Sequence, residues 1–142
     1  MKDLEVGQVL SLRIKMDYCG VFKDKHPYLI ISINEEDNTV EIGQLHSMNG
    51  KLFEIISKSN KAIYQGMPNE TVIDQDSFVQ LNNTIKLEYY DDLSRFRRQT
   101  DKLSSNKLKK VIDAYYDYHK NNRIEESHTI YLNKEDIEEL NN

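Results

Sequence analysis

The sequence of 142 residues is poor in cysteine, lacks tryptophan and contains no long apolar run. Because Cys19 is its one cysteine, no disulfide can form within the chain, which favours a reducing compartment. No stretch approaches the ~20 apolar residues of a membrane helix, and the N-terminal residues have no signal-peptide core. We therefore expect a soluble, cytoplasmic protein with no membrane association.

The charge and the length narrow the class of protein further. A net charge of −5 argues against a protein that coats DNA through bulk positive charge, although it is compatible with a local basic groove. The length indicates one domain with a real core. Nine tyrosines supply aromatic packing with a polar tip.

Short apolar segments separated by polar turns cover the chain up to residue 89, and they are typical of a small β-barrel or sandwich. Leu29, Ile30 and Ile31 are apolar in succession, so their strand should be covered on both faces. Met48-Asn49-Gly50-Lys51 carries the Asn-Gly hairpin signal. The expected strands span residues 7–14, 26–33, 40–47, 52–56, 71–74, 77–81 and 84–89.

After Ser104-Ser105 the apolar period becomes helical, and we expect a helix over 105–119. Residues 121–142 are expected to be an appendage, with an edge strand at 128–132 and a short acidic helix after the cap Asn133. The predicted organisation is thus a β domain with its helix at 1–120 and an appendage at 121–142.

The most informative feature is a predicted hairpin whose open end carries two histidines. A polar link at 34–38 joins its strands, and the expected partners are Ile33 with Thr39, Tyr28 with Gln44, and His26 with His46. Directly opposed side chains lie roughly 5 Å apart. Two neighbouring imidazoles can supply a base and an acid near neutral pH.

Structural interpretations of these residues remain open. His26 is equally compatible with a solvated loop, and His46 and Ser47 with a hydrogen-bonded turn. A metal site built from His26, His46 and Glu41 is a weaker alternative, since no ligand spacing demands it.

A basic run follows the last predicted strand, with Phe96 interleaved and Asp101 as its one acid. It favours phosphate contact and base stacking, or simply a solvated surface. The acidic C-terminal helix could pair with this run and shield a site. The basic residues are Arg95, Arg97, Arg98, Lys102, Lys107, Lys109 and Lys110.

Five segments, in this order, resemble the MazF/PemK family of toxin endoribonucleases, which are related to the CcdB-type gyrase poisons. They are Gly7-Gln8-Val9, His26 to Ser32, Leu45-His46-Ser47, Ser77 to Lys86, and Thr100 to Leu103 with the helix that follows. The resemblance spans about residues 5–119. It implies a small half-open, SH3-like β-barrel with a long terminal helix, which makes the expected fold mainly β with C-terminal α.

The resemblance also implies an activity. Members cleave single-stranded RNA without metal, form homodimers and are blocked by a cognate antitoxin, which makes this chain a toxin-like endoribonuclease of a type II toxin–antitoxin system. Three positions depart from the family: its arginine before proline is His26, its threonine before serine is His46, and its later arginine falls at Ile85 or Lys86. The alternatives are a CcdB-like binder of a protein, or an inactive relative that binds only nucleic acid or an antitoxin.

In this interpretation His26 and His46 share the roles of base and acid, in either order. Ser47 bonds a phosphate oxygen, and Lys86 or Lys25 supplies positive charge. No cofactor and no metal are expected. The predicted catalytic residues are His26, His46 and Ser47, and the predicted RNA-binding residues are Lys25, Gln44, Lys86, Arg95, Phe96 and Arg97.

Overall fold

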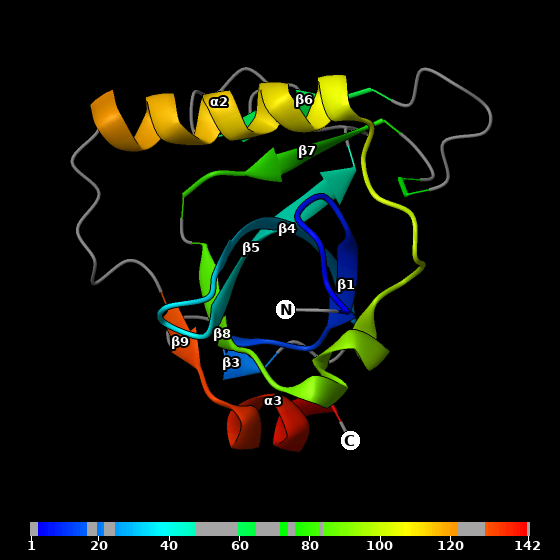
Figure 1. Ribbon diagram of the computed structural model, residues 1–142, viewed down its shortest axis with the longest axis vertical. Coiled ribbons are helices and arrows are strands. Elements are labelled where there is room, and N and C mark those ends of the chain that lie inside the picture. Colours follow the sequence, from blue (N-terminus) through cyan, green and yellow to red (C-terminus); the bar gives the residue numbers. More distant parts are fainter. Residues whose placement is uncertain are drawn as a thin grey trace.

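The computed structural model describes residues 3–16, 20–21, 25–47, 60–64, 72–73, 76–82, 84–121 and 130–141. These residues form a mainly antiparallel β-sheet with helices at two opposite ends (Figure 1). The long helix α2 (Ser105–Asn121) covers one end and the short helix α3 (Lys134–Asn141) the other. The mainly β architecture with a C-terminal helix agrees with the prediction from the sequence.

The main sheet runs in the order β1-β4-β5-β7-β6, and β8 joins β5 to the parallel strand β9. A short ladder of β2 and β3 is separate, and the 3₁₀ helix η1 (Asp91–Phe96) follows β8. The strands are β1 (Val9–Leu12), β2 (Lys15–Met16), β3 (Gly20–Val21), β4 (His26–Asn34), β5 (Thr39–Ser47), β6 (Asn60–Ile63), β7 (Ser77–Gln80), β8 (Ile85–Glu88) and β9 (Ile130–Leu132).

The sheet divides along strand β5. Residues 39–42 pair with β8, whereas residues 45–47 pair with β7. Gly43 lies between the two branches, and a Cβ there would stand 2.7 Å from the Gln80 carbonyl oxygen and 2.8 Å from Ile31 Cδ1. The division therefore requires glycine at this position. Among the described strands, β1, β6 and β9 each pair with one neighbour in the main sheet, so the sheet is not closed into a barrel.

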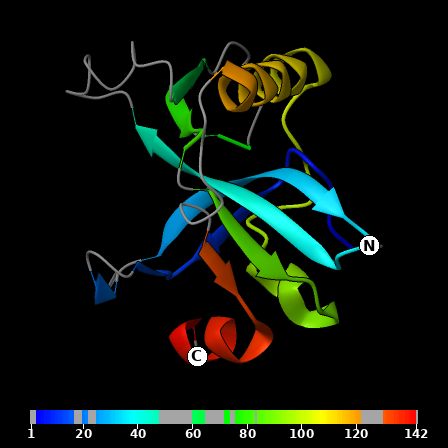
Figure 2. The same cartoon turned by 90° about the vertical axis from the view of Figure 1, so that its left-hand side faces the viewer.

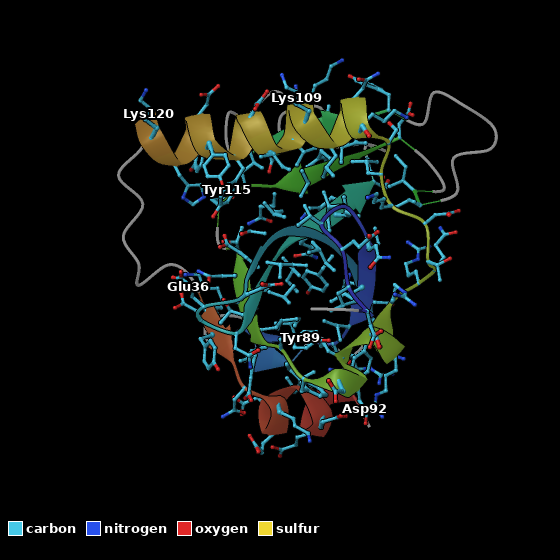
Figure 3. All side chains as sticks on the ribbon, in the orientation of Figure 1. Glu36, Tyr89, Asp92, Lys109, Tyr115 and Lys120 are labelled. Carbon is cyan, nitrogen blue, oxygen red and sulfur yellow. The ribbon has the colours of Figure 1, made fainter. Side chains whose placement is uncertain are left out.

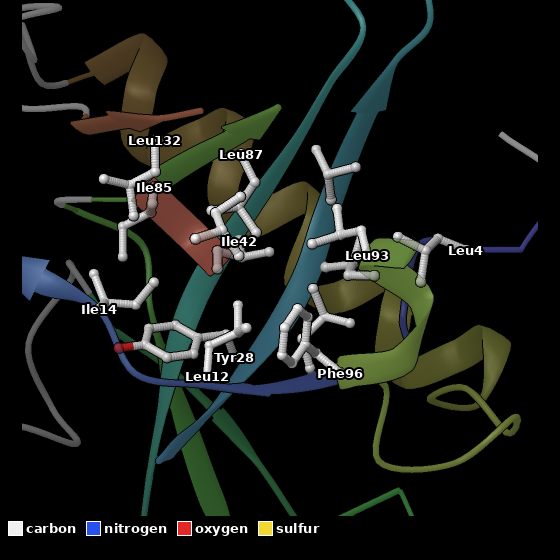
Figure 4. Packing of buried hydrophobic residues seen from close by; sticks show 14 residues of the cluster. Leu4, Leu12, Ile14, Tyr28, Ile42, Ile85, Leu87, Leu93, Phe96 and Leu132 are labelled. Atoms are coloured by element: carbon white, nitrogen blue, oxygen red, sulfur yellow. The ribbon is translucent and has the colours of Figure 1, made fainter. Parts of the chain in front are cut away.

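Both faces of strand β4 are buried, as its unbroken apolar run predicts. Tyr28 and Ile30 pack into a core that extends to η1 and α3 (Figure 4). Leu29 and Ile31 pack into a second core that includes Val111 of α2. In Figure 2 the two helices accordingly lie on opposite sides of the long central strands. Alternate residues of one strand thus hold both ends of the molecule together.

The hairpin register is partly as predicted. Tyr28 lies opposite Gln44, which is confirmed, but Thr39 pairs with Asn34 instead of Ile33. The loop has one residue fewer than expected, and a bulge between Ile30 and Ser32 absorbs the difference. Asn38 closes the loop with a φ of 56°, and its side-chain Nδ2 donates to the Tyr89 carbonyl at 3.1 Å.

The C-terminal segment belongs to the main sheet and its core. Strand β9 pairs in parallel with β8, and Ile137 of α3 is buried in the first core. The Asn133 side chain accepts from the Asp136 N–H at 2.9 Å, which confirms the predicted helix cap.

The segment between β5 and β7 differs in part from the prediction. Of the strand expected at 71–74, the structure describes Val72 and Ile73, which form a bend with both side chains buried in the second core. Strand β6 was not predicted, since its first two residues, Asn60 and Lys61, are polar. The expected hairpin at 48–51 and strand at 52–56 lie outside the described residues. Among the described residues, no helix combines the length and apolar character needed to cross a membrane.

Candidate functional site

The last residues of β5 carry the predicted site, and their positions are set by β7. His46 pairs with Phe78, and their rings stack with centroids 5.0 Å apart at an interplanar angle of 18°. His46 Nε2 lies 3.1 Å from Gln80 Oε1. Phe78 is almost fully buried, so the half-buried imidazole rests on a rigid support.

His26 occupies the start of β4 and pairs with Leu12 of β1. The ladder between β4 and β5 ends at Tyr28 opposite Gln44, two residues before the histidines. Because side chains alternate along a strand, His26 and His46 share the face of Tyr28 and Gln44. The direct opposition of the two imidazoles stays a prediction.

A small pocket lies beside His46. It has a volume of about 40 Å³. Ser47 and the buried Ser77 are paired across β5 and β7. The pocket is lined by Pro27, Leu45, His46, Ser47, Ile73, Ser77 and Arg98.

Arg98 lines the pocket, although the sequence analysis did not single it out as a site residue. It belongs to the predicted basic run, and a backbone contact with strand β1 accompanies its position at the pocket. Its backbone N–H donates to the Val9 carbonyl at 2.9 Å, one residue after the bridge between Leu10 and Arg97. A pocket lined by an arginine and two serines has side chains of the kinds that bind anions.

Strand alternation constrains how these groups cooperate. Ser47 and Ser77 belong to the face of Gly43 and Leu45, whereas the His46 ring belongs to the face of Phe78 and Gln80. A ligand that touches both the Ser47 hydroxyl and the His46 ring must therefore lie across the end of β5.

The other predicted RNA-binding residues of the sheet are spread along it. Lys25 is exposed directly before β4, and half-buried Gln44 is two residues from His46. Lys86 is exposed opposite Glu41, roughly 16 Å along β5 from His46 at 3.3 Å per residue. The structure therefore does not bring Lys86 to the pocket.

The three predicted RNA-binding residues in and directly after η1 make contacts within the protein. The Arg95 guanidinium bonds Glu138 of α3 and lies 4.6 Å from the centroid of the Phe96 ring. Phe96 is 8% exposed and belongs to the first core, which leaves little ring surface for a base. Arg97 donates to the Asp3 carbonyl. The pairing of Arg95 with the acidic helix agrees with the expectation for that helix.

A second polar cluster joins the sheet to α2. The Glu41 carboxylate accepts from Thr84 Oγ1 at 2.8 Å and from the Tyr115 hydroxyl. Figure 3 shows Tyr115 directed from α2 toward the sheet, opposite in direction to Lys109 and Lys120. Burial, and next the hydrogen bond with Glu41, raise the pKa of Tyr115. Among the described residues no group of three His, Cys, Asp or Glu side chains is placed to hold a metal ion.

Comparison with known proteins adds no assignment to this geometry. No known protein family matches the sequence, and no curated protein is significantly similar to it.

Proposed function

We propose that this protein is a metal-independent endoribonuclease that cleaves single-stranded RNA at the end of strand β5. One observation carries the proposal: the pocket that gathers Arg98, Ser47 and His46. Arg98 and Ser47 hold non-bridging oxygens of one phosphodiester, and the guanidinium offsets the charge that develops in the transition state. His46 accepts the proton of the attacking hydroxyl, and His26 donates a proton to the leaving oxygen.

The reaction is an internal displacement. His46 removes the proton from a ribose 2′-OH, and the 2′ oxygen then attacks the adjacent phosphorus. The bond from phosphorus to the 5′ oxygen breaks as that oxygen takes a proton from His26. The products are a 2′,3′-cyclic phosphate and a 5′-hydroxyl, and the RNA strand crosses the end of β5 so that both faces contribute.

The resemblance to the MazF/PemK family supports the same reaction and extends the proposal. In that extension the sheet and α2 form the PemK/CcdB-type half-open barrel. The protein is then a homodimeric toxin that a cognate antitoxin blocks. Induced expression should arrest growth, and growth should resume when the antitoxin is expressed with it.

The cleavage test compares purified variants on a single-stranded RNA, with and without EDTA, and maps the ends. Wild-type protein should yield cyclic-phosphate ends in both conditions. His46→Ala should lose about 10²- to 10⁴-fold in rate, the usual contribution of a general base. Arg98→Ala should also lose activity, whereas Lys120→Ala, which removes an exposed charge on α2, should not. Intact RNA with wild-type protein, or full rates in both site variants, would overturn the proposal.

A second candidate is an inactive relative that binds RNA through the same pocket. Strand alternation favours it, because the Ser47 hydroxyl and the His46 ring lie on opposite faces of β5. Binding without cleavage, weakened by Arg98→Ala but not by His46→Ala, would support this candidate.

A further inference from the structure

Gln80 has no role in the reaction as described so far, yet it contacts the ring of His46. It ends strand β7, two residues after Phe78, and pairs with Asn60 of β6. Its Oε1 lies 3.1 Å from His46 Nε2. Phe78 fixes the plane of the imidazole by stacking, and Gln80 fixes its rotation within that plane.

The contact determines which ring nitrogen carries the proton. An amide oxygen only accepts hydrogen bonds, so Nε2 must be the donor. A neutral imidazole has one N–H, which leaves the lone pair on Nδ1. Gln80 therefore selects a tautomer as well as an orientation.

We propose that Gln80 is a positioning residue that holds His46 with Nε2 protonated, so that Nδ1 is the atom that accepts a proton. The catalytic part of this inference rests on the proposed function, while the tautomer does not. The charged or titratable described groups around His46 are Arg98 in the same pocket, His26 on the neighbouring strand and Asp76 directly before β7.

Two substitutions at Gln80 separate positioning from simple packing. Gln80→Glu places a carboxylate against Nε2–H, which favours the charged imidazolium and should raise the pKa of His46 by about one unit or more. Because a general base must be neutral, the rising limb of the pH–rate profile should move to higher pH by the same amount. Gln80→Met keeps the bulk and removes the acceptor, and its rate should fall about 10- to 100-fold at all pH values.

The measurements are ¹⁵N and ¹H NMR titrations of His46 together with the pH–rate profile. Asn106→Asp makes the same amide-to-acid change on the exposed first turn of α2, and it should leave the His46 titration unmoved. Wild-type spectra should show Nε2 protonated in neutral His46. An Nδ1–H tautomer, or an unchanged His46 titration in Gln80→Glu, would overturn the inference.

These outcomes are distinguishable from failure of the proposed function. If the protein cleaves no RNA, the titration still reports whether Gln80 holds His46. If it does cleave RNA and the titration moves while the rate profile does not, His46 is held by Gln80 but is not the base, and the catalytic part is overturned.

Discussion

Tyr115 is the residue with the most informative proton chemistry in the described part of the chain. Its hydroxyl donates to Glu41 from a half-buried position, and its ring lies 4.2 Å from that of His119. His119 Nε2 in turn lies 3.1 Å from the Leu81 carbonyl oxygen. These contacts fasten the second half of α2 to the sheet, and the first of them lasts only while the phenol keeps its proton.

Replacing Tyr115 tests this fastening through its pH dependence. At neutral pH, Tyr115→Phe should lower the free energy of unfolding by about 1.5–3 kcal/mol, the range for a hydrogen bond to a charged group. The folded pKa is raised above the unfolded value of about 10. The stabilisation is therefore complete below that pH and is lost as the pH rises beyond it.

Urea denaturation at about pH 7 and about pH 10.5 measures both effects. The difference in unfolding free energy between wild type and Tyr115→Phe should shrink at the higher pH. Tyr116→Phe is the matched control, because Tyr116 is adjacent and 63% exposed. A difference that stays constant with pH would contradict the role given to the Tyr115 proton.

At the scale of elements, α3 and β9 close the end of the sheet that is remote from α2. The first N–H of α3, at Lys134, donates to Glu88 Oε1 of β8 at 3.0 Å. At the other end of the helix, Asn141 Nδ2 donates to the Arg13 carbonyl at 3.1 Å. Ile137 lies between these contacts and is the buried residue of α3, so the helix depends on one apolar anchor.

Ile137→Ala should therefore lower the free energy of unfolding by about 2–4 kcal/mol, through lost burial and the cavity that remains. Glu139→Ala, on the exposed side of the same helix, should change it by less than about 0.5 kcal/mol. Chemical denaturation measures both. Equal effects of the two variants would show that α3 does not contribute its buried face to the first core.

The same contacts bear on the basic run and the acidic helix. Glu138 of α3 pairs with Arg95 of η1. No described residue of α3 lines the pocket that contains Arg98. The pocket is thus outside the charge pairs between η1 and α3 that the structure describes.

At the scale of the whole molecule, β4 and β5 are common to both hydrophobic cores. Ile30 and Ile42 belong to the first core, whereas Ile31 and Leu45 belong to the second. Neither core can lose its packing without disturbing strands on which the other depends. The described cores therefore form one structural unit.

This arrangement predicts a single cooperative unfolding transition. Urea curves followed by far-UV circular dichroism, which reports the sheet and helices, and by tyrosine fluorescence should coincide. The matched comparison is the Ile137→Ala variant, whose curves should shift together because the cores are coupled. Two separate transitions would show that the α2 end and the α3 end unfold independently.

Much of the backbone could be predicted from local patterns. The apolar run at 29–31 predicts a strand buried on both faces, and the helical period predicts α2 within two residues at its C-terminal end. Strand β6 was missed because Asn60 and Lys61 have little apolar signal, and its position depends on pairing with β7. The hairpin register was off by one at the loop, since a bulge leaves no trace in apolar alternation.

The candidate site was predictable only in part. The end of β5, with His46 and Ser47, follows from the strand pattern and from the resemblance. Arg98 could not be distinguished from Arg95 and Arg97, because the sequence gives neighbouring arginines the same signal. The hydrogen bond of the Arg98 backbone to Val9 accompanies its position at the pocket, and that contact is visible only in the fold. Nothing in the local sequence marked Gln80 as a site residue, because its contact with His46 joins two strands that are far apart in the chain.

Local sequence patterns account for most of the central strands, for α2 and for the cap at Asn133, because apolar period and turn residues act over a few positions. Three outcomes needed the folded chain: where β5 divides, that the segment after residue 129 joins the sheet, and which arginine lines the pocket with His46. Those outcomes depend on contacts between residues far apart in the chain, such as the approach of Gly43 to Gln80, which no local pattern encodes.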